Sequence, residues 1–403
     1  MKQQQLSVNE EYPDLIILGS TGSVGTQAAD VAAAHGIRVR GISAHRSVQT
    51  VEEQIRRFAP DYAVLTDPDA AADLAVRVAD TSTKVLSGFD GISHMIRETQ
   101  TENPLGMTVE NSILGEAGLG PTLEVLQAGH RLALANKESL VVGGELVMSL
   151  AEAAGAEILP VDSEHCAIFQ CLRAGRRDEI KKILLTASGG PFFGYSREQL
   201  EGVTKAMTLA HPTWKMGAKI TVDSATLMNK GFEVIEAVHL FGVAPDQVQV
   251  VVHRESMIHS MVEYTDHSII AQMSVPDMRH CVQYALTHPY RLPAGDILGE
   301  LDLFSVGKLT FFKPDMETFP LLRLAIDCIR TGGALPAALN AANEVIVAAF
   351  LQEKIRFCDI PDMVTRVVED MHAVSSWHSY AQIMTADKLA RQSAEALLRI
   401  KTC

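Results

Sequence analysis

Two carboxylates with one serine between them, Asp162-Ser163-Glu164, follow an apolar run over residues 156–161. In an extended segment, side chains two residues apart point to the same face, so Asp162 and Glu164 are expected to converge. Converging carboxylates repel each other unless a cation or a shared proton lies between them. Carboxylate oxygens suit a hard divalent cation. The segment therefore indicates a metal site, and the alternative is an acidic strand end in solvent.

A second polar cluster lies further along the chain, where we expect a capped helix over residues 223–241. Asn229, Lys230 and Glu233 are three or four residues apart and would share one face of this helix. An amide, an ammonium and a carboxylate on one face can hold a polyol phosphate and complete a metal site. The alternative is a solvent-exposed face with an ion pair. Gly231 favours the functional interpretation, because glycine inside a helix costs stability and needs a reason.

A glycine-rich turn, Gly19–Gly25, lies between an expected strand at residues 15–18 and an expected helix at residues 26–34. This order is typical of the first unit of a dinucleotide-binding fold. The glycines let the backbone approach a pyrophosphate, which binds at the helix N-terminus. The spacing is GxxGxxG, which differs from the commoner GxGxxG.

The end of the second expected strand, residues 39–42, bears on which dinucleotide is bound. An NAD enzyme usually has Asp or Glu there for the ribose hydroxyls. This chain has His45, Arg46 and Ser47, which are candidate cofactor residues, and the two basic side chains suit the 2′-phosphate of NADP. The alternative is that Arg46 is an ordinary loop charge in solvent.

Polar residues also follow a later expected strand, at residues 131–135. Open parallel sheets bind ligands at the carboxyl ends of their strands, so Asn136, Lys137 and Glu138 are site candidates. Further strands are expected at residues 62–65, 84–86 and 107–111.

The middle of the chain contains a Ser188-Gly189-Gly190 turn after an expected strand at residues 182–186. Such a turn exposes backbone N–H groups and can cradle a phosphate, and a plain turn is the alternative. The loop His211–Gly217 contains Trp214 and could act as a lid over a ligand, whereas the alternative is an ordinary packed loop. Later strands are expected at residues 248–252 and 268–273.

The composition narrows the functional class. The 403 residues are 47% hydrophobic and 21% charged, which is ordinary for a soluble globular enzyme. The sequence has no apolar run long enough to span a bilayer. A net charge of −14 argues against nucleic acid as the main partner. Residues 1–14 are polar and acidic and do not form a secretory signal, and six irregularly spaced cysteines indicate reduced thiols in a cytoplasmic protein.

We expect an α/β fold with a Rossmann-like NADP-binding domain, an α/β catalytic domain that carries the metal site, and a C-terminal helical bundle. Helical spacing of apolar residues is expected near residues 317–330, 336–352, 360–371 and 385–400. The expected boundaries are residues 12–160 for the NADPH-binding domain, 161–292 for the catalytic domain, 293–314 for a linker and 315–403 for the helical domain.

Several of these segments together resemble the 1-deoxy-D-xylulose 5-phosphate reductoisomerase family, in order and over nearly the whole chain. The matching stretches are GSTGSVG at 19–25, ALANKESLV at 133–141, PVDSEHCAIFQ at 160–170, TASGGPF at 186–192, HPTWKMG at 211–217, ITVDSATLMNKGFEVIEA at 220–237 and ALNAANEVIVAAF at 338–350. The chain departs from the family pattern at Ala187, where the family often has glycine, and at His45-Arg46-Ser47, where a Gly-Lys-Asn type of sequence is common.

The resemblance implies an NADPH- and metal-dependent homodimeric enzyme of non-mevalonate isoprenoid biosynthesis. It would rearrange the phosphorylated ketose 1-deoxy-D-xylulose 5-phosphate to an aldehyde, which NADPH reduces to 2-C-methyl-D-erythritol 4-phosphate. The inhibitor fosmidomycin chelates the metal in this family.

The resemblance also implies roles for individual residues. The ligands of Mn²⁺, Mg²⁺ or Co²⁺ would be Asp162, Glu164 and Glu233, which with Lys137 are the catalytic residues. The oxygenated carbons of the substrate would contact Lys137, Ser163 and Glu164. The phosphate end would contact Ser188, Ser224, Asn229 and Lys230, with His211 beside them. The NADPH contacts would be Thr21, Gly22, Ser23, Val24, Arg46, Asn136, Glu138 and Gly217.

Two other classes of protein share parts of this pattern. A different NADP-dependent oxidoreductase, such as a semialdehyde or homoserine dehydrogenase, has a similar glycine turn but needs no set of three carboxylates. A non-catalytic NADP sensor would need only the first domain. Metal dependence of turnover separates the three possibilities.

Overall fold

The computed structural model describes residues 12–214, 216–371 and 379–402. Expectations that concern residues 1–11, Lys215 of the expected lid and Cys403 lie outside these ranges. The described chain forms two compact units. The first unit comprises described residues within 1–139, 147–166 and 277–299, and the second comprises those within 140–146, 167–276 and 300–403. The domain boundaries given above stay a prediction.

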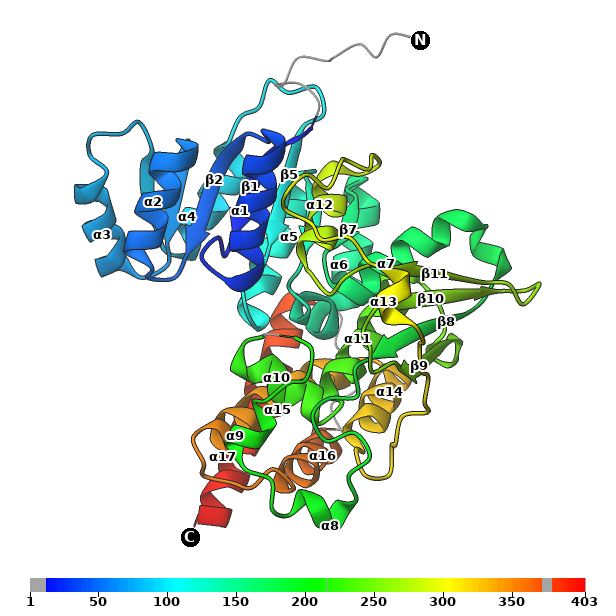
Figure 1. Ribbon diagram of the computed structural model, residues 1–403. Helices are drawn as coiled ribbons and strands as arrows, with labels where there is room; N and C mark the ends of the chain where they lie inside the picture. The colour runs from blue at the N-terminus through cyan, green and yellow to red at the C-terminus, as the bar shows by residue number, and fades with distance from the viewer. Residues whose placement is uncertain (1–11, 215, 372–378, 403) are drawn as a thin grey trace. The chain divides into compact units, whose positions relative to one another are not determined.

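The first unit is built on a seven-stranded parallel sheet with the order β4-β3-β2-β1-β5-β6-β7 (Figure 1). The strands are β1 (Asp14–Leu18), β2 (Val39–Ala44), β3 (Tyr62–Leu65), β4 (Lys84–Ser87), β5 (Met107–Asn111), β6 (Arg131–Leu134) and β7 (Ile158–Pro160). The chain order reverses between β1 and β5, and ligands of open α/β sheets bind at such a switch point. The Rossmann-like fold expected from the sequence is therefore confirmed.

Helices cover both faces of this sheet, as the near-continuous apolar runs of its central strands require. Residues 15–18 of β1 are completely buried. The helices are α1 (Ser23–His35), α2 (Val48–Phe58), α3 (Pro68–Arg77), α4 (Gly88–Glu98), η1 (Glu116–Gly118), α5 (Leu119–Gln127) and α12 (Arg279–Thr287). Helix α12 comes from a distant part of the sequence and packs against α1, β6 and β7. Helices α6 (Glu138–Ala154) and α7 (Ser163–Cys171) each have residues in both units.

The second unit contains a four-stranded sheet with the order β11-β10-β8-β9. Its strands are β8 (Ile180–Ala187), β9 (Val248–Val252), β10 (Ile258–Tyr264) and β11 (Ile269–Met273). Strands β8 and β9 are parallel, and β10 runs antiparallel to both β8 and β11. The sequence prediction omitted β10, whose residues are all buried and show none of the polar alternation of a half-exposed strand.

Helices make up the rest of the second unit. They are η2 (Leu172–Ala174), η3 (Arg177–Glu179), α8 (Arg197–Leu200), α9 (Lys205–Thr208), α10 (Ala218–Ala225), α11 (Met228–Phe241), η4 (Pro245–Gln247), α13 (Leu303–Val306), α14 (Leu321–Thr331), α15 (Leu335–Leu351), α16 (Asp359–Met371) and α17 (Tyr380–Thr402). Helix α15 packs against α14, α16 and α17, so the expected C-terminal helices are present. None of the described helices is long and apolar enough to cross a membrane.

The segment around Asp162 is not extended, so the predicted strand-like arrangement of Asp162, Ser163 and Glu164 was wrong. Strand β7 ends at Pro160, and α7 begins at Ser163. The Asp162 carboxylate accepts a hydrogen bond from the Glu164 backbone N–H, with 3.1 Å between Oδ1 and N. Side chains of this type favour a helix start, because they satisfy an N–H group that the helix itself leaves unpaired.

The predicted single helix over residues 223–241 was also wrong, because α10 and α11 divide it. Leu227 lies between them in the left-handed region, with a φ of 60°. Asp223 and Ser224 therefore belong to the last turn of α10 and do not cap α11. The glycine inside α11 has a packing reason, since a Cβ at Gly231 would lie 2.6 Å from Cβ of Ala325 on α14.

Candidate functional site

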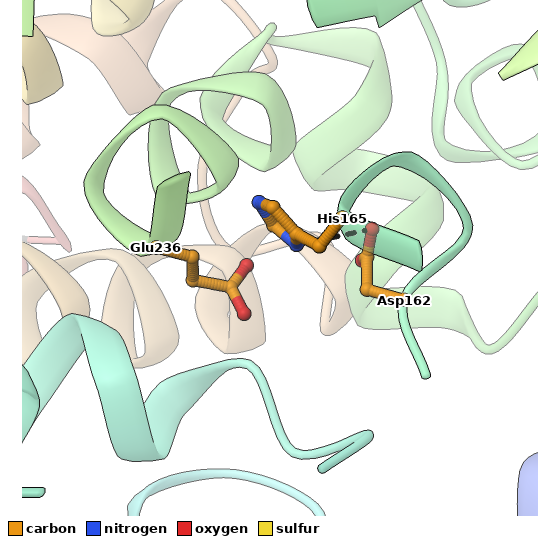
Figure 2. A group of neighbouring side chains, drawn as sticks. All are labelled: Asp162, His165 and Glu236. Atoms are coloured by element: carbon orange, nitrogen blue, oxygen red, sulfur yellow. Dashed lines mark ion pairs between the residues drawn. The ribbon is translucent and has the colours of Figure 1, made fainter. Parts of the chain in front are cut away.

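Lys137 and Asp162 form an ion pair at the carboxyl end of the first unit's sheet. The distance from Nζ to Oδ2 is 2.7 Å. Lys137 follows β6 and precedes α6, whereas Asp162 lies between β7 and α7. The two strands are parallel neighbours, so their carboxyl ends bring the two side chains to the same edge. Nδ1 of His165, in the first turn of α7, lies 3.3 Å from Asp162 Oδ1 (Figure 2).

The Asp162 carboxyl group stays ionised in this setting. Burial raises its pKa, but the Lys137 ammonium and His165 lower it by more, and its pKa lies well below the ordinary value. Glu164 lies one residue past the start of α7, where its Oε2 accepts a hydrogen bond of 2.7 Å from the Ser163 hydroxyl. The end of the sheet thus presents carboxylate oxygens, which are the donors preferred by hard divalent cations.

Helix α11 carries the second set of predicted residues on one face, as expected. Nδ2 of Asn229 donates to Oε1 of Glu233 over 2.6 Å, and the Lys230 ammonium pairs with the other oxygen of the same carboxylate. Glu233 and Lys230 are buried. Glu236, also labelled in Figure 2, is a further buried carboxylate of α11. Asp162 and Glu164 belong to the first unit, and Glu233 belongs to the second.

A hydroxyl and an imidazole meet at the end of β8 in the second unit. Nε2 of His211 lies 3.0 Å from Oγ of Ser188. Nδ1 of His211 accepts from the backbone N–H groups of Thr213 and Trp214, at 3.3 and 3.0 Å. The proton of the neutral ring must therefore be on Nε2, which donates to Ser188. Burial, and to a smaller extent Arg254, lowers the pKa of His211 to about 4, so the ring is neutral near pH 7.

The two glycines after Ser188 bring this turn against α10. Gly189 and Gly190 have φ values of 78° and 66°, which other residues rarely adopt. A Cβ at Gly190 would lie 2.8 Å from the carbonyl oxygen of Ser224. The turn therefore lies beside the C-terminal end of α10, which carries Ser224.

The expected lid loop leads directly into α10. The Trp214 ring lies 6.2 Å from the ring of His259, measured between centroids. Gly217, expected to contact the cofactor, is the N-cap residue of α10 and is exposed. Contacts of the Trp214 indole therefore connect this loop to β10, which carries His259.

Two glycines of the turn in the first unit lie close to other backbone atoms. Gly19 has a φ of 85°, and a Cβ there would lie 2.8 Å from the carbonyl oxygen of Ser112, next to β5. A Cβ at Gly25 would lie 2.2 Å from the Gly19 carbonyl oxygen. No described side chain caps α1, whose first turn begins at Ser23. The other predicted contacts of this turn, Thr21, Gly22 and Val24, are exposed or partly exposed around this helix start.

Both basic residues after β2 contact the loop that follows β3. Arg46 forms an ion pair of 2.6 Å with Asp67, and 68% of its side-chain surface is exposed. Nδ1 of His45 lies 2.8 Å from Oγ1 of Thr66. Ser47 is exposed and immediately precedes α2. Both basic side chains thus lie at the carboxyl ends of β2 and β3, on the sheet edge where the adenosine end of a dinucleotide binds in such folds.

Asn136 has a structural role that the sequence did not reveal. Its side-chain amide donates to the carbonyl oxygens of Ile113 and Gly115 at 2.6 and 2.9 Å. It also donates to Glu138 at 3.2 Å, while its oxygen accepts from the Ser139 backbone at 2.8 Å. The amide therefore holds the loop after β5 against the start of α6, beside the switch point.

Arg254 contacts the Ser188 turn, and the sequence analysis did not single it out. It follows β9, and its Nη1 donates to the carbonyl oxygens of Ser188 and Gly190. Strand β9 is the parallel neighbour of β8. Ligands often bind at the carboxyl ends of parallel strands, and this rule could have identified Arg254 as a candidate.

Comparison with known proteins gives one consistent family. The domain families that match are described as 1-deoxy-D-xylulose 5-phosphate reductoisomerase over residues 15–144, its C-terminal domain over residues 158–241, and the DXP reductoisomerase C-terminal domain over residues 273–393. The 1-deoxy-D-xylulose 5-phosphate reductoisomerase of Desulfitobacterium hafniense (strain DSM 10664 / DCB-2) is 48% identical over 387 residues, which cover 95% of this chain and 99% of the relative.

Solved structures agree with these relatives. The reductoisomerase from Zymomonas mobilis in complex with NADPH matches with a TM-score of 0.89 and 38% identity, over 96% of this chain and 99% of that one. A structure of DOX-P reductoisomerase with NADPH, fosmidomycin and magnesium matches with a TM-score of 0.89 and 38% identity, over 96% and 98%. From sequence, fold and these similarities over nearly its whole length, the chain belongs to the 1-deoxy-D-xylulose 5-phosphate reductoisomerase family.

Proposed function

We propose that this chain catalyses the NADPH- and divalent-metal-dependent isomerisation and reduction of 1-deoxy-D-xylulose 5-phosphate to 2-C-methyl-D-erythritol 4-phosphate, a step of non-mevalonate isoprenoid biosynthesis. The observation that carries the proposal is the 48% identity, over 95% of the chain, to a relative that bears the name of this enzyme. The ionised Asp162 beside Lys137 supports it, because a carboxylate that is held ionised is suited to bind a cation.

The proposed metal ligands are Asp162, Glu164 and Glu233. All three offer carboxylate oxygens, and Glu164 and Glu233 are each oriented by a hydrogen bond from a neighbouring side chain. This donor set fits Mg²⁺, and by the same chemistry Mn²⁺ or Co²⁺. When bound, the cation would polarise adjacent substrate oxygens and offset the negative charge that develops on them.

The side chains around these carboxylates would bind and orient the substrate. We assign contacts with its oxygenated carbons to Lys137, Ser163 and Glu164. Lys137 also orients Asp162 through their 2.7 Å ion pair, so it would keep that carboxylate in place as substrate binds. The phosphate end would be held by Ser188, His211, Ser224, Asn229 and Lys230. The ammonium of Lys230 is the cation of this group, since His211 is neutral near pH 7.

The proposed NADPH site combines the glycine turn with the ends of β2 and β6. Its residues are Thr21, Gly22, Ser23, Val24, His45, Arg46, Ser47, Asn136, Glu138 and Gly217. The start of α1 would bind the pyrophosphate, and Arg46 would pair with the 2′-phosphate. We further propose that the enzyme works as a homodimer in the cytoplasm.

The two alternative classes are not favoured. A semialdehyde or homoserine dehydrogenase, or an NADP sensor, would not require a set of three carboxylates. The family matches extend beyond the first domain, over residues 158–241 and 273–393.

The decisive experiment follows NADPH oxidation at 340 nm with 1-deoxy-D-xylulose 5-phosphate, with and without a chelator such as EDTA. We expect turnover that requires the substrate, stops with chelator and returns when Mg²⁺ or Mn²⁺ is added in excess. A rate of NADPH oxidation that the chelator does not change would favour another NADP-dependent oxidoreductase. Binding of NADPH without oxidation would favour a sensor.

A further inference from the structure

Arg254 stands at the carboxyl end of β9 in a position that the backbone fixes. The backbone N–H of His253 donates to the carbonyl oxygen of Ala187 over 2.8 Å, which extends the pairing of β8 and β9 by one step. Nε2 of His253 accepts from the backbone N–H groups of Met257 and Ile258, both at 3.2 Å. Arg254 is thereby placed opposite the turn that begins at Ser188.

A single nitrogen of Arg254 bridges both ends of that turn. Nη1 lies 2.7 Å from the carbonyl oxygen of Ser188 and 2.6 Å from that of Gly190. The guanidinium also lies over the Phe193 ring, with 5.1 Å between Cζ and the ring centroid. Hydrogen bonds from a charged donor are roughly twice as strong as neutral ones, so the two carbonyls are held firmly toward Arg254.

This arrangement determines what the turn presents on its other side. A peptide bond is planar and trans, so a Ser188 carbonyl directed at Arg254 turns the Gly189 N–H away from Arg254. The Ser188 hydroxyl oxygen accepts from Nε2 of His211 at 3.0 Å and from the Gly190 N–H at 3.3 Å. With two bonds accepted, the hydroxyl hydrogen of Ser188 is left to donate to an anionic oxygen.

We propose that Arg254 is a positioning residue for the phosphate end of the substrate, acting by holding the Ser188-Gly189-Gly190 turn so that the Ser188 hydroxyl and the Gly189 N–H face the phosphate. The inference rests on the proposed function and adds a residue to it. Arg254 acts through the turn, and its charge also helps to keep His211 neutral and able to donate to Ser188 from Nε2.

The test compares Arg254→Leu, Arg254→Gln and Arg254→Lys with the wild type in steady-state kinetics. Leucine removes the charge and the donors, glutamine keeps donors on a shorter neutral chain, and lysine keeps a charge with several N–H donors. The matched control is Arg330→Leu, because Arg330 of α14 is a half-exposed arginine of the same unit whose ion pairs are with Asp246 and Asp327.

We expect Arg254→Leu to raise the KM for 1-deoxy-D-xylulose 5-phosphate by about tenfold to a hundredfold, the range for losing charged hydrogen bonds. The KM for NADPH should stay within about twofold, and inorganic phosphate should become a weaker competitor of the substrate by a similar factor. Arg254→Lys should recover most of the loss, and Arg330→Leu should behave as the wild type.

An unchanged substrate KM in folded Arg254→Leu would overturn the proposal, as would equal increases of both KM values or a lysine variant as poor as the leucine one. If Arg254→Leu does not fold, Arg254→Gln decides by the same criteria. A wild-type protein without turnover would instead count against the proposed function. Wild-type turnover with a substrate KM that does not change on replacing Arg254 would count only against this inference.

Discussion

Asn229 donates a hydrogen bond to Glu233 across one turn of α11, with 2.6 Å between Nδ2 and Oε1. The other oxygen of that carboxylate pairs with Lys230. The buried carboxylate thus has both oxygens engaged by its own helix, and the two neighbours fix its orientation. Orientation by neighbouring side chains is typical of carboxylates that bind metals.

Glu233→Gln tests this residue as a metal ligand, because glutamine keeps the shape and the acceptor for Asn229 but removes the charge. We expect the affinity for Mn²⁺ and the turnover to fall by orders of magnitude, since stabilisation of developing charge is usually a large term in catalysis. NADPH affinity should hardly change, because the glycine turn belongs to the first unit. Titration calorimetry with each ligand measures both effects.

Two results of that titration would count against the assignment. Unchanged Mn²⁺ affinity with lost activity would make Glu233 a substrate contact. If metal affinity and activity were both unchanged, Glu233 would lie outside the site. Glu98→Gln, which changes an exposed carboxylate at the end of α4, is the matched control and should leave both ligands unaffected.

Arg46→Glu tests the choice of cofactor. A carboxylate at this exposed position would repel the 2′-phosphate of NADPH, which NADH lacks, so the KM for NADPH should rise at least about tenfold more than that for NADH. Arg57→Glu, which changes an exposed arginine of α2 paired with Asp30, serves as the control for net charge. Equal increases in the KM values for NADPH and NADH would show that Arg46 does not bind the 2′-phosphate.

Glu110 of β5 should make stability depend on pH. Its carboxyl group is completely buried and Oε1 has no partner among the described residues, although the Ser112 hydroxyl donates to Oε2 over 3.1 Å. Burial raises its pKa to about 8, above the ordinary value of 4.5. Because the folded state holds this proton more tightly than the unfolded state does, the free energy of unfolding should fall as the pH rises from about 4.5 to about 8.

Glu110→Gln removes this ionisation and keeps an acceptor for Ser112. The variant should gain stability relative to the wild type as the pH rises through this window, by an amount on the order of a few kcal/mol. Urea unfolding of both proteins at pH 5, 6.5 and 8 measures the difference. A constant difference across these pH values would mean that Glu110 does not carry the raised pKa.

Trp214 should report closure of the loop His211–Gly217. The chain contains two tryptophans, and Trp377, which lies outside the described residues, can be removed by Trp377→Phe. We expect the emission of the remaining indole, which packs near His259, to change when fosmidomycin is added together with NADPH and Mg²⁺. A flat response in a catalytically active variant would rule out a lid that closes over the ligand.

The sequence predicted the first unit well because its physical signals are local. The apolar strands β1 and β5 are bounded by turns, and the glycines at 19 and 25 are required where backbone atoms approach closely. The spacing of Asn229 and Glu233 was enough to place them on one helical face. These features depend on residues that are close together in the sequence, so a single sequence is enough to predict them.

The features that were predicted wrongly or missed depend on tertiary contacts. Leu227 adopts a positive φ without the glycine or asparagine that usually marks such a position. Strand β10 is buried on both faces and shows no alternation. Arg254 contacts the turn after β8 only because β8 and β9 pair, although Val252 and Ala187 are far apart in sequence.

The position of α12 in the chain has a consequence for biosynthesis. This helix covers α1, β6 and β7 with an apolar face that includes Val282, Ala285 and Leu286. A ribosome completes β7 at Pro160 and adds residues at about 5–20 per second, so the last strands of the sheet must wait several seconds for this cover. During that interval the nascent chain presents an apolar surface that α12 covers in the folded protein.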